Sequence, residues 1–256
     1  KAVSLGANPI LAIKTATINT AKHFRIHDVG AIGIGYKANF SIVDDIRALN
    51  ILSVYKEGEE IYNRKTGLVA FDRPKIDKKL LLRINHTFNI KELQPSDFAI
   101  EKQDEYTVIG LHNKQITTEK IVTSDISDCV MLAVAERHKG TGHIGKCYLS
   151  GYGLKNGAIA TSIAHDAHNL IVAGKTEKDM SVAANRVRQN NGGFAIALDG
   201  EVIGELALPL AGLMCDKPIE ETTEIMDRLH SIASELGVNP EIDPFMTLGF
   251  VSLTVI

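Results

Sequence analysis

The residues best suited to chemistry in this chain lie in one short stretch, HDAHN, at positions 165–169. His165, Asp166, His168 and Asn169 lie between two apolar runs, AIAT and LIVAG. Ionisable side chains are costly inside buried strands unless a partner compensates them, so we expect a polar turn between two strands. Histidine is the commonest metal ligand and proton carrier near neutral pH. These four residues are therefore candidates for a catalytic role.

The same residues also have a purely structural explanation. His165 and His168 are three positions apart, so they would face opposite sides of a strand and converge only on a tight turn. Asp166 and Asn169 could cap such a turn through hydrogen bonds from side chain to backbone, with the histidines at its rim. Because buried unpaired imidazoles are costly, we expect at least one histidine to face a cleft or a domain boundary. The residues alone leave both explanations open.

Two further motifs carry weaker signals. Glu136, Arg137 and His138 end the apolar run DCVMLAVA, where they could serve a site or where a Glu–Arg pair could fix a loop. The stretch GTGHIG at 140–145 matches neither GxGxxG nor GxxxxGK[ST], and no helix follows it, so we predict a loop between close strands. Neither an HxH strand nor an HExxH helix occurs, so the chain has no obvious set of metal ligands.

Composition and charge limit the class of partner. The 256 residues are 45% hydrophobic and 23% charged, with a formal net charge of −3 and no basic cluster, so nucleic acid is not expected. No apolar run is long enough for a membrane span, and no signal peptide is visible. Cys129, Cys147 and Cys215 lie far apart and match no zinc spacing, which favours a reducing compartment, by default the cytoplasm.

Both ends of the chain are unusual for a domain. It begins at Lys1, without a methionine, and enters a helical pattern almost at once. It ends at Ile256 inside the apolar run TLGFVSLTVI, although natural domain ends are usually solvated. We therefore expect the chain to be a portion of a longer protein.

Apolar periodicity and capping signals predict the helices. They are expected over residues 10–24, 177–190 and 218–236. Thr176 and Asp179 have the spacing of a capping box, with Asp in place of the usual Glu or Gln. Asp216 is the predicted cap of the last helix.

The strand signals complete the predicted fold. Glu57-Gly58 and Asp199-Gly200 each predict a hairpin turn, and DCVMLAVAERH is typical of a strand covered on both faces. The class is therefore α+β (mixed α/β), with helices packed on a mainly antiparallel sheet. We predict a helix with a small sheet over 1–63, a charged linker over 64–95 and an α+β domain over 96–256.

Several segments resemble one family. NPILAIKTATINTAKHF, GAIGIGYKANFSIVDD and the hairpin VYKEGEEI resemble the end of an amidohydrolase, that is, the last barrel helix and a small β-sandwich segment. AERHKGTGHIGKCYLSGYGLKNGAIATSIAHDAHNLIVAG, NGGFAIALDGEVIGELALPLAGLMCD and ELGVNPEIDPFMTLGFVSLTVI resemble the C-terminal domain of bacterial adenine deaminases. Asn39, Cys147 and Ala167 depart from the residues more usual in that family, which are Asp, Gly and Ser.

The resemblance implies a parent enzyme on a (β/α)8 barrel that hydrolyses adenine to hypoxanthine and ammonia, a purine-salvage reaction. A divalent metal, manganese or iron, would activate the attacking water. The family's metal ligands lie on barrel strands upstream of Lys1, so none is expected in this chain, which alone should be inactive. The HDAHN residues would orient adenine or exclude water at the barrel mouth, in a homo-oligomeric enzyme. The helix over 10–24 should expose an apolar face.

Two other functions stay open on the sequence. The chain could be a non-catalytic structural or dimerisation domain, which a test of metal content and adenine turnover on the chain alone would separate from an enzyme. It could also be the same domain appended to another purine or cyclic-amide amidohydrolase, and a chain extended upstream would decide that question.

Overall fold

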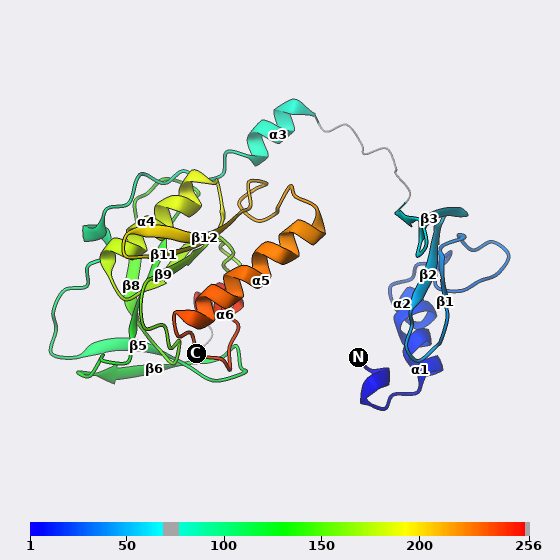
Figure 1. The fold of residues 1–256 in the computed structure, drawn as a ribbon, viewed down its shortest axis with the longest axis horizontal. Helices are drawn as coiled ribbons and strands as arrows, with labels where there is room; N and C mark the ends of the chain where they lie inside the picture. The colour runs from blue at the N-terminus through cyan, green and yellow to red at the C-terminus, as the bar shows by residue number, and fades with distance from the viewer. Residues whose placement is uncertain (69–76, 254–256) are drawn as a thin grey trace. The chain divides into compact units, whose positions relative to one another are not determined.

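The structure is a computed structural model that describes residues 1–68 and 77–253. It divides into two compact units, Lys1–Lys75 and Ile76–Ile256 (Figure 1). Residues 69–76 of the predicted linker lie outside the described residues. Within the described ranges, no helix has the length and apolar character needed to cross a membrane.

A helical segment begins the first unit. After a short 3-10 turn (Val3–Leu5), it consists of α1 (Pro9–Lys14), a π-helical turn (Thr15–Asn19) and α2 (Thr20–His23). Asn8 caps it by accepting a hydrogen bond from the Leu11 N–H. Ala21 is buried, whereas Ile10 and Leu11 are 53% and 60% exposed. The predicted helix and its exposed apolar residues are therefore confirmed.

Four antiparallel strands form the sheet of the first unit. They are β1 (Phe40–Val43), β2 (Ile51–Lys56), β3 (Glu59–Asn63) and β4 (Gly67–Leu68), paired in that order. Glu57 and Gly58 join β2 to β3 with φ angles of 53° and 87°. Two successive positive φ angles define the type I′ turn of a tight hairpin, as predicted.

An eight-stranded sheet is the frame of the second unit, in the order β12-β11-β9-β10-β7-β8-β5-β6. The strands are β5 (Tyr106–Leu111), β6 (Thr118–Thr123), β7 (Val130–Ala135), β8 (Ile144–Ser150), β9 (Ala158–Thr161), β10 (Leu170–Gly174), β11 (Gly193–Leu198) and β12 (Glu201–Ala207). All neighbouring pairs are antiparallel except β5 and β8, which are parallel. The prediction of a mainly antiparallel sheet is confirmed.

Helices cover both faces of this sheet. On one face α4 (Glu177–Gln189) packs against β9, β10 and β11. On the other face α5 (Ile219–Glu235) packs against β11 and β12, and α6 (Pro244–Val251) packs against β9 and β10. Ile159 and Ile171 belong to the α5–α6 core, whereas Ala160 and Val172 belong to the α4 core. The predicted α+β class is confirmed. The two helices predicted for this unit, α4 and α5, begin and end within two residues of their predicted bounds.

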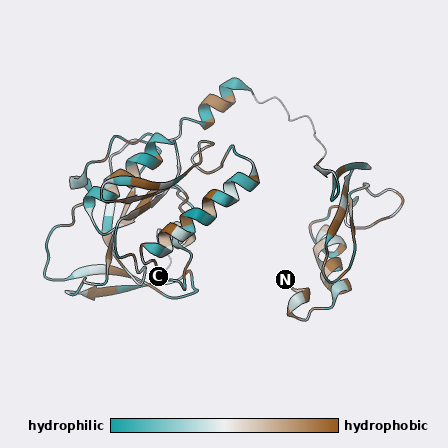
Figure 2. Ribbon diagram, in the orientation of Figure 1, coloured by the Kyte–Doolittle hydropathy of each residue, from teal (hydrophilic) through white to brown (hydrophobic). Residues whose placement is uncertain are grey.

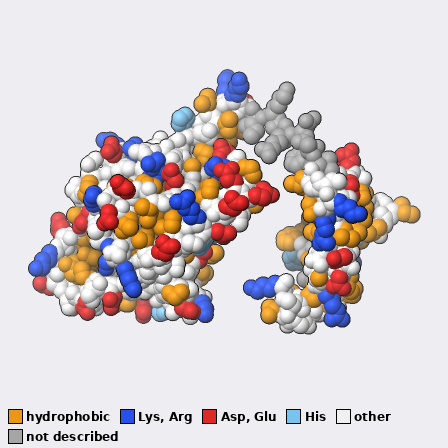
Figure 3. Space-filling model, in the orientation of Figure 1, with side chains coloured by type: hydrophobic (Ala, Val, Ile, Leu, Met, Phe, Trp, Pro, Cys, Tyr) orange, Lys and Arg blue, Asp and Glu red, His pale blue; other side chains and the backbone are white. Residues whose placement is uncertain are grey.

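Surface polarity follows this layering. Along α5, hydrophilic colour alternates with hydrophobic colour, as expected for a helix with one buried face (Figure 2). Acidic side chains gather over the N-terminal end of α5 (Figure 3), where its first turn carries Glu220 and Glu221. Carboxylates are favourable there because the N-terminus of a helix carries a partial positive charge.

The later part of the segment before the sheet packs against α4. The segment contains α3 (Lys78–Ile84) and a 3-10 turn (Pro95–Phe98), and Phe98 is 1% exposed. The backbone N–H of Leu93 donates to the Asn185 side-chain oxygen, and the Asn185 amide donates back to the Leu93 carbonyl. The linker over 64–95 stays a prediction, and these contacts support placing its last residues with the second unit.

The capping signals of the two long helices had different outcomes. Thr176 caps α4 by accepting from the Asp179 N–H, as predicted, although the short Asp carboxylate does not reach back to the cap backbone. The prediction that Asp216 caps α5 is wrong. The helix begins at Ile219 with Pro218 at its cap position and no side-chain cap, because Asp216 lies too far upstream to reach the first free N–H groups.

The Asp179 carboxylate joins the start of α4 to the β11–β12 hairpin. One of its oxygens accepts from the Thr176 hydroxyl, at 2.9 Å, and the other accepts from the Gly200 N–H, at 2.7 Å. Asp179→Ala is expected to lower the free energy of unfolding by about 1–3 kcal/mol, because a buried N–H loses its partner. Asp179→Asn keeps one acceptor and should lose less. Urea unfolding measures both, and wild-type stability in Asp179→Ala would contradict the prediction.

Candidate functional site

The HDAHN stretch forms a turn between β9 and β10, as predicted. Asp166 and His168 have φ angles of 55° and 47°, in the left-handed region that Asp and His enter more readily than most residues. The His168 N–H donates to the Ala164 carbonyl and closes the turn. The turn therefore places the side chains of His165 and His168 on one side, which a strand would not do.

His165 binds α6 at the edge of the turn. Its backbone N–H donates to the Gly249 carbonyl at 2.6 Å, and its ring stacks on Phe250 with centroids 5.1 Å apart and planes inclined by 22°. The imidazole Nδ1 lies 2.9 Å from a carboxylate oxygen of Asp166. Both side chains are largely exposed, so the carboxylate orients the ring without forming a buried ion pair.

His168 lies deeper than His165. Burial lowers the pKa of the His168 imidazole, and the nearby Arg137, His138 and His165 lower it further, so the neutral ring predominates near neutral pH. Its Nδ1 atom and the Asn169 side-chain oxygen are buried without a hydrogen-bond partner within the described part of the chain. Such atoms are uncommon in folded proteins and mark places where a group from outside can bind.

These contacts bear on the structural explanation of the turn. Asp166 bonds the His165 ring rather than the backbone, and the Asn169 side-chain oxygen has no partner within residues 1–68 and 77–253. The turn is closed by backbone atoms instead. A capping role for these two side chains therefore receives no support, while their part in catalysis stays a prediction.

Arg137 holds the turn from beneath. Its guanidinium is 1% exposed and donates to three backbone carbonyls, those of His168, Thr87 and Ala211, and to the Thr87 hydroxyl. The guanidinium carbon also lies 4.4 Å above the Phe88 ring. Burial lowers the pKa of Arg137 to about 10, so the group stays charged at neutral pH. The carbonyl dipoles of three segments thus stabilise one buried charge.

Of the two explanations that the sequence left open for Glu136, Arg137 and His138, a Glu–Arg pair that fixes a loop receives no support, because the two side chains have separate partners. His138 Nε2 lies 2.8 Å from the Ala167 carbonyl, a second contact with the turn. The Glu136 carboxylate instead accepts from the Lys139 and Thr141 backbone and others in the loop, and these hydrogen bonds lower its pKa to about 2. Both residues follow the end of β7, where Arg137 is 1% exposed and Glu136 binds the loop that comes after it. GTGHIG forms the predicted loop, here between β7 and β8.

The two histidines of the turn open on an apolar cavity of about 380 Å³. Its other lining residues come from β11, α5, α6 and their flanks: Ile163, Phe194, Met226, His230, Asp243, Phe245, Met246, Gly249 and Phe250. The expectation that at least one histidine faces a cleft is confirmed. Apolar and aromatic walls with a few polar groups are typical of a small-molecule site.

Sequence reasoning missed His230 and Asp243 in this cavity. His230 follows the buried Leu229 on α5, and no motif in the sequence set it apart. Asp243 before Pro244 is an N-cap signature of α6, and this was the signal that could have found it. The pairing of the two residues could not be read from the sequence, since a loop separates them.

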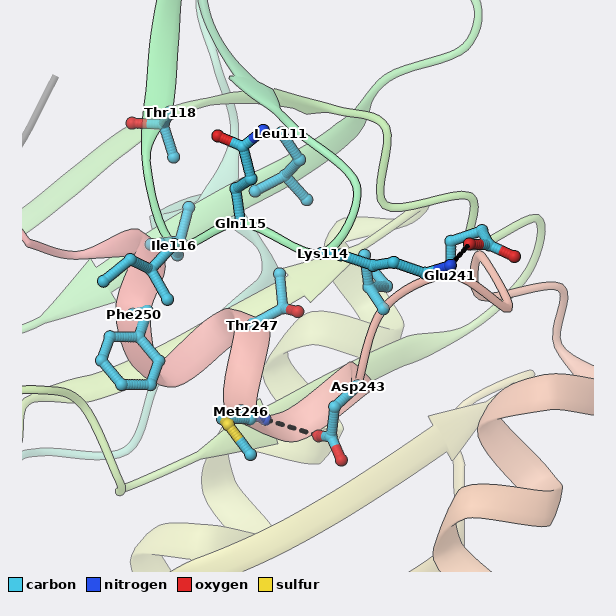
Figure 4. Close-up of a pocket in the computed structure, with 12 residues that line it drawn as sticks. Leu111, Lys114, Gln115, Ile116, Thr118, Glu241, Asp243, Met246, Thr247 and Phe250 are labelled. Carbon is cyan, nitrogen blue, oxygen red and sulfur yellow. Dashed lines mark hydrogen bonds and ion pairs between the residues drawn. The ribbon is translucent and has the colours of Figure 1, made fainter. Parts of the chain in front are cut away.

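A smaller cavity of about 200 Å³ lies against another side of α6 (Figure 4). It shares Asp243, Met246 and Phe250 with the larger cavity, and an ion pair between Lys114 and Glu241, 2.7 Å apart, lies at its edge. Figure 4 shows this pair pointing along the rim rather than into a common centre. The smaller cavity contains no histidine and offers less chemistry.

The donor set does not fit a metal ion. Within residues 1–68 and 77–253, no three His, Cys, Asp or Glu side chains are grouped so that they could hold one. The site can stack a planar ring, and the neutral His168 imidazole can donate and accept a hydrogen bond. Binding and orientation of a flat molecule are therefore what this arrangement can supply.

Arg137 offers a direct test of how the turn is held. Arg137→Met is expected to lower the free energy of unfolding by about 3–5 kcal/mol. The reason is that three backbone carbonyls would lose the donor with which they are hydrogen-bonded. Arg137→Lys keeps the charge but cannot reach all three, so its loss should be smaller but measurable. Arg186, in an exposed ion pair with Glu205, is the control, and Arg186→Met should lose below about 1 kcal/mol. If denaturant unfolding gave Arg137→Met as small a loss in free energy of unfolding as Arg186→Met, this explanation of how the turn is held would be refuted.

Comparison with known proteins identifies the family. The adenine deaminase C-terminal domain model matches residues 108–256, and the amidohydrolase family model matches residues 2–61. The chain is 39% identical to adenine deaminase 2 of Carboxydothermus hydrogenoformans, 39% to adenine deaminase of Nitratidesulfovibrio vulgaris (strain DP4) and 37% to that of Petrotoga mobilis. Each match covers 100% of this chain and 46% of the relative, so the chain spans about half the relatives' length. The chain therefore belongs to the adenine deaminase family and carries its C-terminal domain.

Proposed function

We propose that the chain is part of an enzyme that hydrolyses adenine to hypoxanthine and ammonia, and that its HDAHN turn orients adenine or excludes water. The names of the relatives support the reaction. The observation that carries the role of the turn is His168, a neutral imidazole beside an apolar cavity, whose buried Nδ1 atom has no hydrogen-bond partner among the described residues. Arg137 fixes the backbone of that residue, so the ring is held before any ligand arrives.

The chemistry of adenine suits this surface. The base is flat and aromatic, with hydrogen-bond donors and acceptors only along its edge. The rings of Phe250 and Phe245 line the cavity and can pack on such a face, while His165 and His168 can bond an edge. A neutral His168 can donate a hydrogen bond from one ring nitrogen and accept one at the other, and it places no charge against an uncharged base. In the reaction, water adds to the carbon that bears the amino group and ammonia leaves, and the turn would supply orientation for that step.

In this proposal, the divalent metal of the complete enzyme is not bound by the described residues of this chain. Manganese or iron would supply an activated hydroxide when bound. The described residues of this chain do not fit such an ion, so we assign it to the barrel that the amidohydrolase resemblance implies. No step of the chemistry is assigned to a metal ligand of this chain.

The wider setting follows from the composition and the family. We infer a cytoplasmic, homo-oligomeric enzyme of purine salvage that acts on a small molecule and not on nucleic acid or a membrane. The net charge of −3 and the lack of a basic cluster support the exclusion of nucleic acid. The limits of 1–63 and 96–256 remain our proposal for its two domains.

The chain alone should not deaminate adenine. Purified as these 256 residues, it is expected to release no ammonia from adenine, with or without added manganese or iron, because the described residues hold no metal-ligand set. An enzyme-coupled ammonia assay measures this directly. Metal-dependent release at a rate comparable to that of a complete enzyme would contradict the expectation.

The histidines should affect kinetics more than stability. In the complete enzyme, His165→Ala or His168→Ala is expected to lower kcat/KM about two- to tenfold, the effect of one lost hydrogen bond to an uncharged group. The melting temperature should change little. His143→Ala, in the exposed β7–β8 loop away from the cavity, is the control and should leave both quantities unchanged. A clear fall in melting temperature with near-normal kcat/KM would leave the turn a structural role only.

A further inference from the structure

His230 has two hydrogen-bond partners that can only accept. Its Nδ1 atom lies 2.8 Å from the Met226 carbonyl, and its Nε2 atom lies 3.0 Å from a carboxylate oxygen of Asp243. An imidazole donates from both nitrogens only when it is protonated. The geometry of this pair therefore calls for an imidazolium facing a carboxylate.

Asp243 uses its second oxygen for a different task. That oxygen accepts from the backbone N–H groups of Phe245, at 3.0 Å, and Met246, at 2.7 Å, and so caps the first turn of α6. One carboxylate thus joins α5, through His230, to the start of α6. The buried Tyr152 hydroxyl also donates to the Pro244 carbonyl, so α6 keeps one anchor to the sheet if the pair is lost.

The same helix carries both contacts with His165. The Gly249 carbonyl accepts from its backbone, and the Phe250 ring stacks on its imidazole. At the other end of α6, Phe245 meets the His230 ring edge to face, with centroids 5.2 Å apart. A continuous series of contacts therefore runs from His230 through Asp243 and α6 to the HDAHN turn, on the wall of one cavity.

We propose that His230 and Asp243 are positioning residues of the candidate site: the pair fixes α6, and α6 fixes His165 against the cavity. This inference rests on the proposed role of the HDAHN turn in adenine hydrolysis. The pair acts through His165 and Phe250, so neither residue has to touch the substrate. Its contribution lies in the placement of the ring rather than in proton transfer.

The pair should depend on pH in a defined direction. Partial burial lowers the pKa of His230, but its hydrogen bonds to Met226 and Asp243, with the charges of Asp243 and Asp227, outweigh this effect and raise the pKa above the ordinary value. His165 and His168 face the same cavity from the turn. A raised pKa means that the paired state is fully present below the ordinary value of about 6.5 and is lost as pH rises through the folded-state pKa.

Steady-state kinetics with adenine on the complete enzyme, from about pH 6 to about pH 9, test the proposal. His230→Gln and Asp243→Ala are each expected to lower kcat/KM about three- to tenfold at the acidic end. The difference from wild type should shrink as pH rises for His230→Gln, whereas part of it should persist for Asp243→Ala, which also loses the cap of α6. Asp243→Asn should recover activity, because Asn also caps helices and its amide can donate to a neutral His230 at any pH. His143→Gln is the matched control and should follow the wild-type profile.

A double variant tests whether His230 acts through His165. If it does, His165→Ala combined with His230→Gln should lose no more than His165→Ala alone, whereas fully additive losses would overturn the proposal. Wild-type profiles for His230→Gln and Asp243→Ala, beside a kinetic defect in His165→Ala, would overturn the inference while the proposed function stands. Normal kinetics in both His165→Ala and His168→Ala would refute the proposed role of the HDAHN turn, and the positioning role with it. Melting temperatures recorded alongside ensure that folded enzyme is compared.

Discussion

A single buried guanidinium organises the second unit around its candidate site. Arg137 directs its hydrogen bonds to Thr87, before the sheet, to His168 in the turn and to Ala211, in the loop after β12. These segments are far apart in the sequence, and each supplies a carbonyl that accepts a hydrogen bond from the same charged group. Desolvating a charge is costly, so the fold tolerates it only when all three segments are in place. Arg137 therefore makes the position of the turn a condition of folding.

The backbone beside Arg137 leaves room for its guanidinium. Gly212 follows the Ala211 carbonyl with a φ angle of 73°, and a Cβ atom there would lie 2.8 Å from a guanidinium nitrogen. No larger residue fits without displacing the charge or straining the backbone. The positive charge in turn helps to keep His168 neutral, since it disfavours a second cation nearby. Arg137 thus fixes the backbone of His168 and adds to the effect of burial on the pKa of its ring.

Signals that act over short distances in the chain predicted much of the fold. The Thr176 cap, the glycine hairpins at 58 and 200 and the continuous apolar strand β7 were all found where the sequence placed them. The prediction for Asp216 was wrong because several residues near a helix start can cap it, and the sequence does not say where the first turn closes.

The site was harder to predict because its contacts join distant residues. The sequence singled out HDAHN, but the convergence of its histidines depends on left-handed backbone at Asp166 and His168, which polar residues allow without requiring. The sequence left open a pair between Glu136 and Arg137, whereas the structure gives each side chain separate partners. His230 and Asp243 are 13 positions apart and meet only across the loop between α5 and α6.

The most direct test of the central claim, that the HDAHN turn serves the reaction, is a crystal structure of the complete enzyme with hypoxanthine bound. The account predicts that a ring nitrogen of His165 or His168 lies about 3 Å from the base, or that one of the two rings touches a residue in contact with it. A structure in which the turn lies remote from the base, with other residues between them, would contradict it.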